Sequence, residues 1–131
     1  MPANERRSEL NAITENLIGC GYRVSNTLGP GLLEKVYENA LAHEVQKAGL
    51  SVAQQHPIQV YYDGVVVGDY VADLLVDESI IVEIKAVKAL DDVHTAQCLN
   101  YLKATEVEVG LLLNFGPKPQ VRRKAFDNKR K

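Results

Sequence analysis

The fold of this chain is decided by residues 72–86, which read ADLLVDESIIVEIKA. Two apolar runs rich in Val, Ile and Leu lie on either side of the polar segment Asp77–Ser79. Short apolar runs separated by a polar turn are typical of an antiparallel hairpin. The stretch therefore predicts two paired, largely buried strands.

Three charged residues interrupt these strands, namely Asp73, Glu83 and Lys85. If the turn consists of the three residues Asp77–Ser79, Asp73 lies opposite Glu83 on one face of the hairpin, with the side chains about 5 Å apart. Lys85 leaves the same face as Glu83 because side chains alternate along a strand. A turn of two residues would instead place Asp73 and Glu83 on opposite faces.

Two opposed carboxylates require a neutralising partner. They repel each other, and their burial costs several kcal/mol unless another group offsets the charge. Lys85 can offset one charge, whereas a divalent cation would offset both, and carboxylate oxygens suit Mg²⁺ or Mn²⁺. The alternative is an exposed strand face on which Glu83 and Lys85 form an ordinary ion pair.

Hydrophobic periodicity places the other elements around this hairpin. The expected elements, in chain order, are helices over 5–28 and 32–48, strands over 51–62, 65–76 and 80–86, a helix over 89–105, a strand over 107–115 and an edge strand over 121–126. This order, ααβββαβ(β), predicts an α/β (α+β) fold in which helices flank a mixed β-sheet of four to five strands.

Length and composition limit the class of protein. The chain has 131 residues, which fits a single domain, and its 46% hydrophobic and 24% charged residues exclude a disordered or fibrous protein. No apolar run approaches the roughly 18 residues that a membrane span needs, so we expect no membrane association. Cys20 and Cys98 are too few and too far apart for a disulfide scaffold or a zinc knuckle, which favours the cytoplasm.

The charge of the chain is unevenly distributed. The net charge is −2, but residues 117–131 carry seven basic residues and one acid, a charge of +6, which leaves −8 on residues 1–116. Such a basic arm indicates contact with a polyanion, although it can equally be a solvated tail. The candidate nucleic-acid contacts are Arg122, Arg123, Lys124, Lys129, Arg130 and Lys131.

Four motifs in this order resemble a known superfamily. Asp73, followed by Glu83-x-Lys85 and then by a helix, resembles the active-site signature of the PD-(D/E)XK nucleases. Residues 31–37, GLLEKVY, fit the G-x-x-E-x-x-Y motif that names a small prokaryotic family within that superfamily. Residues 97–101, QCLNY, fit the Q-x-x-x-Y motif of RecB-like members. Ala72 stands where the signature often has Pro.

The resemblance implies a restriction-endonuclease-like core and a metal-dependent nuclease. One or two Mg²⁺ or Mn²⁺ ions would be held by Asp73, Glu83, Glu34 and the backbone carbonyl of Ile84. Lys85 would orient the attacking water or stabilise the charge that develops on the phosphate. The substrate would be a phosphodiester bond of nucleic acid, DNA in preference to RNA.

Three further residues would support this site. Tyr37 is expected to lie partly in the core, with its hydroxyl directed towards the site. The resemblance implies that Gln97 and Tyr101 support Lys85 or the nucleic-acid backbone. Each motif also has a plainer interpretation: Glu34 as an exposed acid near a helix N-terminus, and the Gln97–Tyr101 pair as the rim of an amphipathic helix.

Two other functions fit the same sequence. One is a non-catalytic nucleic-acid-binding or adaptor module that retains the nuclease fold, and the other is a protein-interaction domain whose charged face is structural. A homodimer is a candidate source of specificity, because the chain has no separate recognition domain. With no Trp and only two Phe, the composition does not indicate an aromatic platform on which bases stack.

Overall fold

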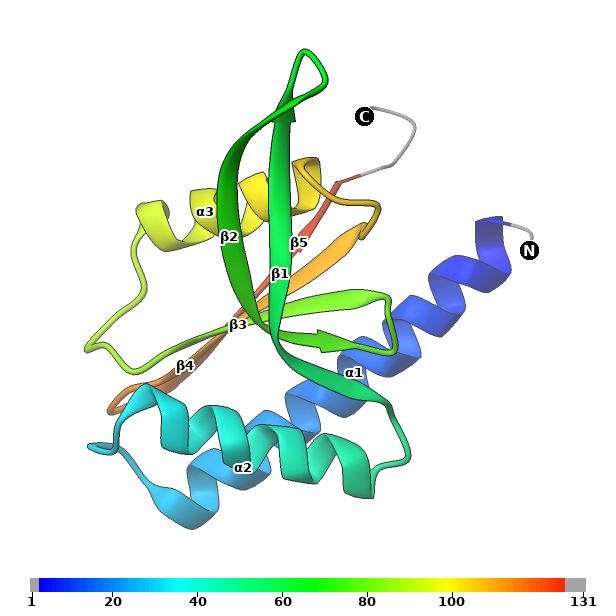
Figure 1. Ribbon diagram of the computed structural model, residues 1–131. Helices are drawn as coiled ribbons and strands as arrows, with labels where there is room; N and C mark the ends of the chain where they lie inside the picture. The colour runs from blue at the N-terminus through cyan, green and yellow to red at the C-terminus, as the bar shows by residue number, and fades with distance from the viewer. Residues whose placement is uncertain (1–2, 127–131) are drawn as a thin grey trace.

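The computed structural model describes residues 3–126, which form helices and strands in the expected order (Figure 1). The elements are α1 (Ala3–Leu28), α2 (Glu34–Lys47), β1 (Val52–Tyr62), β2 (Val65–Val76), β3 (Ile80–Lys85), α3 (Asp92–Lys103), β4 (Val109–Phe115) and β5 (Pro119–Ala125). No helix in this part of the chain is both long enough and apolar enough to cross a bilayer.

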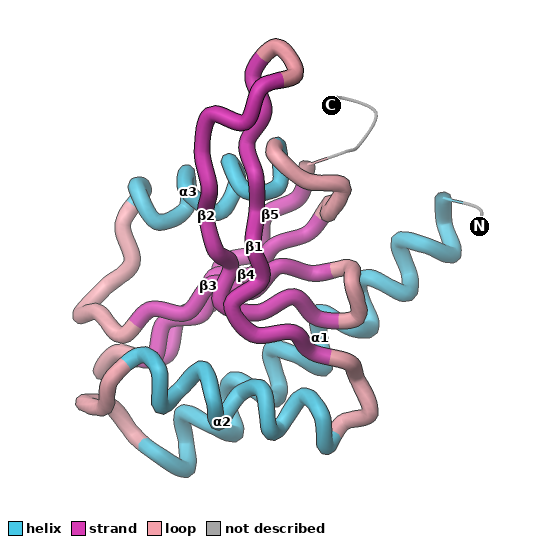
Figure 2. Tube along the Cα trace, viewed as in Figure 1, coloured by secondary structure: helices cyan, strands magenta, loops and turns pink. Residues whose placement is uncertain are grey.

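The strands form one mixed sheet in the order β1-β2-β3-β4-β5. β3 and β4 are parallel, and the other neighbouring pairs are antiparallel. A parallel pair needs a crossover connection, which α3 supplies. In Figure 2, α1 and α2 lie together on one side of the sheet and α3 lies apart from them, across the strands. The predicted α+β fold with a five-stranded mixed sheet is therefore confirmed.

The core consists of two apolar layers on the two faces of the sheet. Ile80, Val82 and Ile84 of β3 pack in the layer that contains α1 and α2. Ile81 packs in the second layer with Leu102 of α3. Burial on both faces explains why β3 is a continuous apolar run, and alternation directs Glu83 to the side of α3.

A capping residue sets the start of α3. The Asp91 side chain accepts hydrogen bonds from the backbone N–H groups of Val93 (2.9 Å) and His94 (3.2 Å). Asp is a strong helix N-cap because its side chain satisfies backbone donors that have no partner in the first turn. The helix therefore begins at Asp92, whereas periodicity predicted a start at residue 89.

The β1–β2 hairpin extends beyond the layers of the core (Figure 1). Its outer part carries exposed apolar side chains, among them Tyr61, Tyr62, Val65, Val66, Val67, Tyr70 and Val71. A contiguous exposed apolar region of this kind is typical of a binding surface.

Candidate active site

Asp73 and Glu83 lie together where β2 separates from β3. The last backbone pair of the ladder on this side is Leu74 with Val82, which confirms the three-residue turn. Beyond it, the Asp73 N–H donates to Glu83 Oε1 (3.4 Å), and the Ile84 N–H donates to Asp73 Oδ2 (2.8 Å). Side chains thus replace the backbone pairing, and the two carboxyl groups share one site.

An irregularity in β1 lies beside Asp73. The ladder between β1 and β2 omits the Gln55–Asp73 pair without a shift in register, and Gln55 has a φ of 54°. Such a φ is uncommon outside glycine. The Gln55 Nε2 lies 2.7 Å from Glu38 Oε1 and 3.5 Å from Asp73 Oδ1. Gln55 therefore links these two carboxyl groups.

Both carboxyl groups have raised pKa values. Burial raises the pKa of Asp73, and the Glu38 carboxylate raises it further, against the lowering effect of the Ile84 N–H. Burial also raises the pKa of Glu83, to about 8, and the charge of Asp73 adds to the shift. Lys85 lies close enough to lower the pKa of both groups, but burial outweighs it. The site thus has an excess of negative charge.

Asn114 braces the chain directly after Lys85. Lys85 ends β3 beside Asn114 of β4. The buried Asn114 side chain accepts from the Val87 N–H (2.9 Å) and donates to the Val87 carbonyl (2.9 Å). Sequence analysis did not select Asn114, although a polar residue inside the apolar run 109–115 was the available signal.

Glu34 lies near the pair but outside it. It begins α2, its side chain is exposed, and its charge contributes to the raised pKa of Glu83. Among residues 3–126, however, no group of three or more His, Cys, Asp or Glu side chains gathers closely enough to hold a metal ion. The structure therefore does not assemble Asp73, Glu83 and Glu34 into one ligand set.

Tyr37 has a structural position. Its hydroxyl donates to the Gly29 carbonyl (2.6 Å) and accepts from the Leu32 N–H (3.1 Å). Its buried ring stacks on Phe115, with centroids 4.7 Å apart. The hydroxyl thus bonds to the loop before α2. From the sequence it was expected to point towards the carboxylates.

Glu38 is a site residue that sequence analysis missed. Its side chain is buried and accepts from Lys35 Nζ (2.8 Å), Gln54 Nε2 (2.7 Å) and Gln55 Nε2 (2.7 Å). It follows Tyr37 on the helix, and an acid beside the apolar stripe of α2 was the signal that could have identified it.

Comparisons with known proteins identify the superfamily of this chain and its fold. The sequence pattern of the PD-(D/E)XK nuclease superfamily matches residues 11–124. The chain belongs to this superfamily. The crystal structure of SSO0001 has a similar fold, with a TM-score of 0.56 at 17% sequence identity. The match covers 95% of this chain but only 65% of that one. No curated protein matches the chain significantly.

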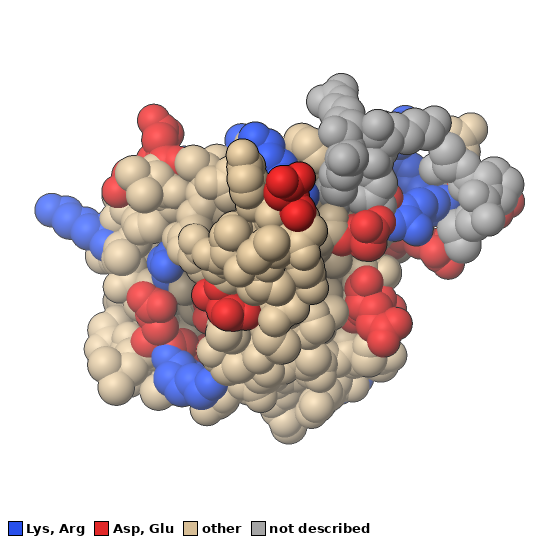
Figure 3. All heavy atoms as spheres, turned by 45° about the horizontal axis from the view of Figure 1, so that its top comes forward, with Lys and Arg blue, Asp and Glu red and all other residues tan. Residues whose placement is uncertain are grey.

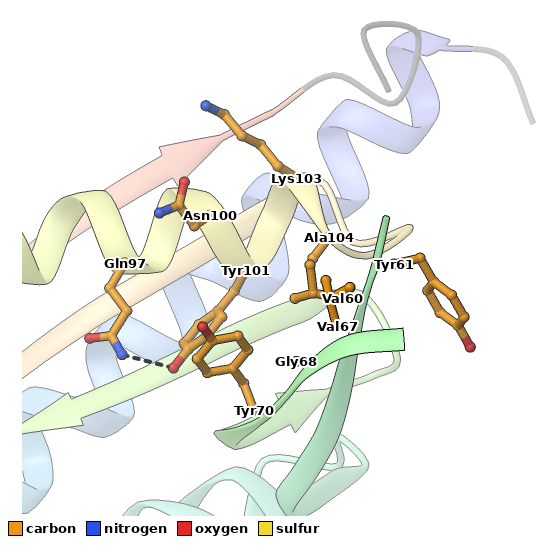
Figure 4. A pocket seen from close by; sticks show the side chains of 10 residues that line it. All are labelled: Val60, Tyr61, Val67, Gly68, Tyr70, Gln97, Asn100, Tyr101, Lys103 and Ala104. Carbon is orange, nitrogen blue, oxygen red and sulfur yellow. Dashed lines mark hydrogen bonds between the residues drawn. The ribbon is translucent and has the colours of Figure 1, made fainter. Parts of the chain in front are cut away.

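In this PD-(D/E)XK protein, the side chains of Gln97 and Tyr101 form a hydrogen bond with each other. The Gln97 Nε2 donates to Tyr101 Oη at 2.9 Å, on the side of α3 that faces the β1–β2 hairpin (Figure 4). Burial raises the pKa of the Tyr101 phenol, and the charge of Glu83 raises it further. The pair is therefore near the carboxylates, but its amide is bonded to Tyr101 rather than to Lys85.

The basic residues of β5 do not form one surface. Arg122 donates to Thr95 Oγ1 (2.8 Å) at the start of α3, whereas Arg123 donates to Asn11 Oδ1 (3.1 Å) on α1. These neighbours thus brace helices on opposite sides of the sheet. On the face drawn in Figure 3, Lys and Arg side chains form separate groups between acidic and uncharged residues. Of the other candidate contacts, Lys124 lies on β5, whereas Lys129, Arg130 and Lys131 lie outside the described residues.

The donors at the site fit a hard divalent cation. Asp73 and Glu83 supply carboxylate oxygens within one partly buried site, and Lys85 alone does not offset their charge. Burial is the main cause of both raised pKa values, and a cation there would stabilise the ionised carboxylates against it. These are the donor types that Mg²⁺ and Mn²⁺ prefer.

Proposed function

We propose that this protein is a Mg²⁺- or Mn²⁺-dependent nuclease of the GxxExxY family. It hydrolyses phosphodiester bonds of nucleic acid, DNA in preference to RNA. The observation that carries the proposal is the placement of Asp73 and Glu83 in one partly buried site beside Lys85. Membership of the nuclease superfamily supports it.

The metal would be held by Asp73, Glu83 and the Ile84 carbonyl, with Glu34 nearby on α2. When bound, the ion supplies Lewis acidity, which favours ionisation of water and stabilises charge on phosphate oxygens. The Ile84 N–H fixes Asp73 Oδ2 at 2.8 Å, so this carboxylate is oriented before any ligand arrives.

Lys85 would act on the substrate side of the site. It lies on the same strand face as Glu83, and its ammonium group influences both carboxyls. A cation in this position can orient the attacking water or stabilise the charge that develops on the phosphate. Asn114 holds the backbone that follows Lys85 and so fixes the direction of β3 at this point.

A second candidate function is a non-catalytic nucleic-acid-binding or adaptor module. The observation in its favour is that Glu34 does not join Asp73 and Glu83 in one ligand set within residues 3–126. Retention of Asp73, Glu83 and Lys85 favours the nuclease, because a binding module has no need for opposed buried carboxylates. Dimerisation would be a way to gain specificity in either case.

Cleavage assays separate the two functions. The purified protein would be incubated with single-stranded and duplex DNA and RNA in Mg²⁺, in Mn²⁺ and in EDTA. We expect cleavage that requires the metal and is lost in Lys85→Ala and Asp73→Asn. The matched control is Lys88→Ala, which removes an exposed lysine from the same segment.

Two outcomes would decide against the nuclease. The first is the absence of cleavage of every substrate by the folded wild-type protein. The second is equal cleavage by wild type and Lys85→Ala, which would identify a contaminating nuclease. Binding of nucleic acid without cleavage would support the adaptor module.

A further inference from the structure

A groove lies between the β1–β2 hairpin and α3 (Figure 4). Its volume is about 640 Å³, within the usual range for a site that holds a small organic group. The hairpin contributes Val60, Gly68 and Tyr70, and the helix contributes Gln97, Tyr101 and Lys103. The groove is thus built from the part of the hairpin that extends beyond the core.

Tyr70 presents an aromatic ring to this groove. Its side chain is 48% exposed, whereas Tyr101 beside it is only 7% exposed. The two ring centroids are 5.7 Å apart, and the rings are inclined by 57°. The buried Tyr101 therefore holds Tyr70 in place while leaving part of the Tyr70 ring open. An exposed ring that is braced in this way is suited to stack on another flat group.

Gly68 keeps the Tyr70 ring uncovered. A Cβ atom at position 68 would lie 3.4 Å from Tyr70 Cε2 and 3.9 Å from Val60 Cβ. Any larger side chain would consequently pack onto the ring and fill this part of the groove. Glycine inside a strand weakens the strand and often marks a place where a ligand approaches the backbone closely.

The groove adjoins the candidate active site. Both the Glu83 and the Asp73 carboxylates raise the pKa of Tyr101, after the larger effect of burial. Tyr70 and Asp73 also belong to the same strand, β2. Tyr101 therefore borders both the groove and the site of the two carboxyl groups.

The charge of the groove differs from the net charge of residues 1–116. No carboxylate is among the described residues that line the groove, although residues 1–116 as a whole carry a net charge of −8. The Lys103 and Asn100 side chains point away from Tyr70, whereas the Gln97 side chain points towards Tyr70 and Tyr101 (Figure 4). The groove therefore has no acidic side chain that would repel a polyanion, and the Gln97 amide can bond to a polar base edge.

We propose that this groove binds an unpaired base of a nucleic-acid strand, stacked on Tyr70. It thereby selects single-stranded or locally unpaired segments for the site at Asp73 and Glu83. In a duplex, both faces of each base are covered by neighbouring bases, so a single open ring has nothing to stack on. This inference rests on the proposed function and names its substrate class. The tyrosines supply the platform that a count of Trp and Phe did not indicate.

Binding without metal tests the inference separately from cleavage. The probes are one 2-aminopurine-labelled sequence as single-stranded DNA, as single-stranded RNA and as a DNA duplex, each titrated with wild-type protein in EDTA. We expect at least one single strand to bind about tenfold more tightly than the duplex, with quenching of the fluorescent base on stacking. Tyr70→Leu and Gly68→Val should each lose about tenfold in affinity, whereas Tyr70→Phe should bind as wild type does.

Tyr62→Leu is the matched control, since Tyr62 is an exposed tyrosine of the same hairpin that does not line the groove. Gly68→Val introduces a residue that favours strands, so we expect it to fold. It therefore still tests stacking on Tyr70 if Tyr70→Leu fails to fold. Equal affinity for duplex and single strands, or unchanged single-strand affinity in folded Gly68→Val, would overturn the inference. If the wild-type protein binds single strands more tightly than the duplex but cleaves no substrate, the proposed function alone is refuted. If it cleaves nucleic acid but binds single strands and duplex equally, this inference alone is refuted.

Discussion

The Ile84 backbone N–H donates to Asp73 Oδ2 at 2.8 Å, where the backbone ladder between β2 and β3 has already ended. One side chain thus joins the two strands across the point at which they separate. The same side chain is the proposed metal ligand. Structural and functional contributions of Asp73 can therefore be separated by the choice of substitution.

Asp73→Asn and Asp73→Ala should differ in stability but not in activity. Asn retains an oxygen that accepts from Ile84 and removes the repulsion with Glu83, so we expect a Tm at or above that of wild type. Ala leaves the Ile84 N–H without its partner, which costs about 1 kcal/mol of unfolding free energy. Both variants should lose metal-dependent cleavage. Thermal unfolding beside the cleavage assay checks this, and equal Tm values for the two variants would contradict it.

The metal-free protein should lose stability as the pH rises. The pKa of Glu83 in the folded protein, about 8, lies above its ordinary value of 4.5. Between these values the folded state keeps a proton that the unfolded chain has released. The contribution of Glu83 to the free energy of unfolding is therefore fully present below pH 4.5 and is lost as the pH rises towards 8. The slope is at most about 1.4 kcal/mol per pH unit.

Denaturant unfolding in EDTA across this pH range measures the slope. Glu83→Gln should flatten it, because the amide does not titrate. Millimolar Mn²⁺ should oppose the loss at high pH, since a cation binds the ionised form preferentially. A slope that persists unchanged in Glu83→Gln would assign the effect to another group.

Much of this fold could be predicted from the sequence, because the spacing of apolar residues along the chain differs between helices and strands. The opposition of Asp73 and Glu83 followed from the length of the turn after Val76. Contacts between distant segments could not be obtained in this way. The bonds from Asn114 to Val87, and from Gln55 to Glu38, depend on how β4 and β1 are placed in three dimensions.

The contacts of Tyr37 and Arg122 differ from those expected from the sequence for a related reason. A motif identifies which residues matter without saying what each one touches. Tyr37 fits its motif, yet its hydroxyl is bonded to the loop at Gly29 and Leu32. Arg122 belongs to a basic segment, yet its guanidinium is bonded to Thr95. In both cases a hydrogen bond to a residue outside that motif or segment holds the polar group, and local sequence carries little information about such contacts.

Gly116→Ala should disturb the chain that leaves the active site. A Cβ atom at position 116 would clash with the Val87 carbonyl oxygen, so this backbone must move. We expect a loss of about 1–3 kcal/mol in unfolding free energy, as for other overpacked sites. Cleavage should also fall, because Lys85 is two residues before Val87.

Gly19→Ala is the control for this substitution. No atom lies within 4 Å of the Cβ position at residue 19 in α1, so alanine should stabilise the helix by about 0.5–1 kcal/mol. Thermal unfolding and the cleavage assay apply to both variants. An unchanged Tm and normal cleavage in Gly116→Ala would show that the contact with Val87 is not restrictive.

Two acids near the start of α2, Glu34 and Glu38, should affect different properties when they are replaced. Glu34 is exposed, its charge contributes to the raised pKa of Glu83, and we propose it as a third carboxylate for the metal. Glu38 is buried and accepts hydrogen bonds from three side chains, including Gln55 beside Asp73. One residue thus has the exposure expected of a ligand, and the other has the contacts expected of a structural brace.

Glu34→Gln should therefore leave the Tm in EDTA unchanged and weaken Mn²⁺ binding. Glu38→Gln should lower the free energy of unfolding by about 2 kcal/mol, because an amide loses the ion pair with Lys35 and one of the acceptor oxygens. Its effect on Mn²⁺ affinity should be smaller than that of Glu34→Gln, since the Glu38 oxygens already have donors from Gln54 and Gln55. Thermal unfolding in EDTA and calorimetric Mn²⁺ titration measure the two properties independently. If Glu38→Gln lost Mn²⁺ binding while Glu34→Gln kept it, Glu38 would replace Glu34 as the proposed third ligand.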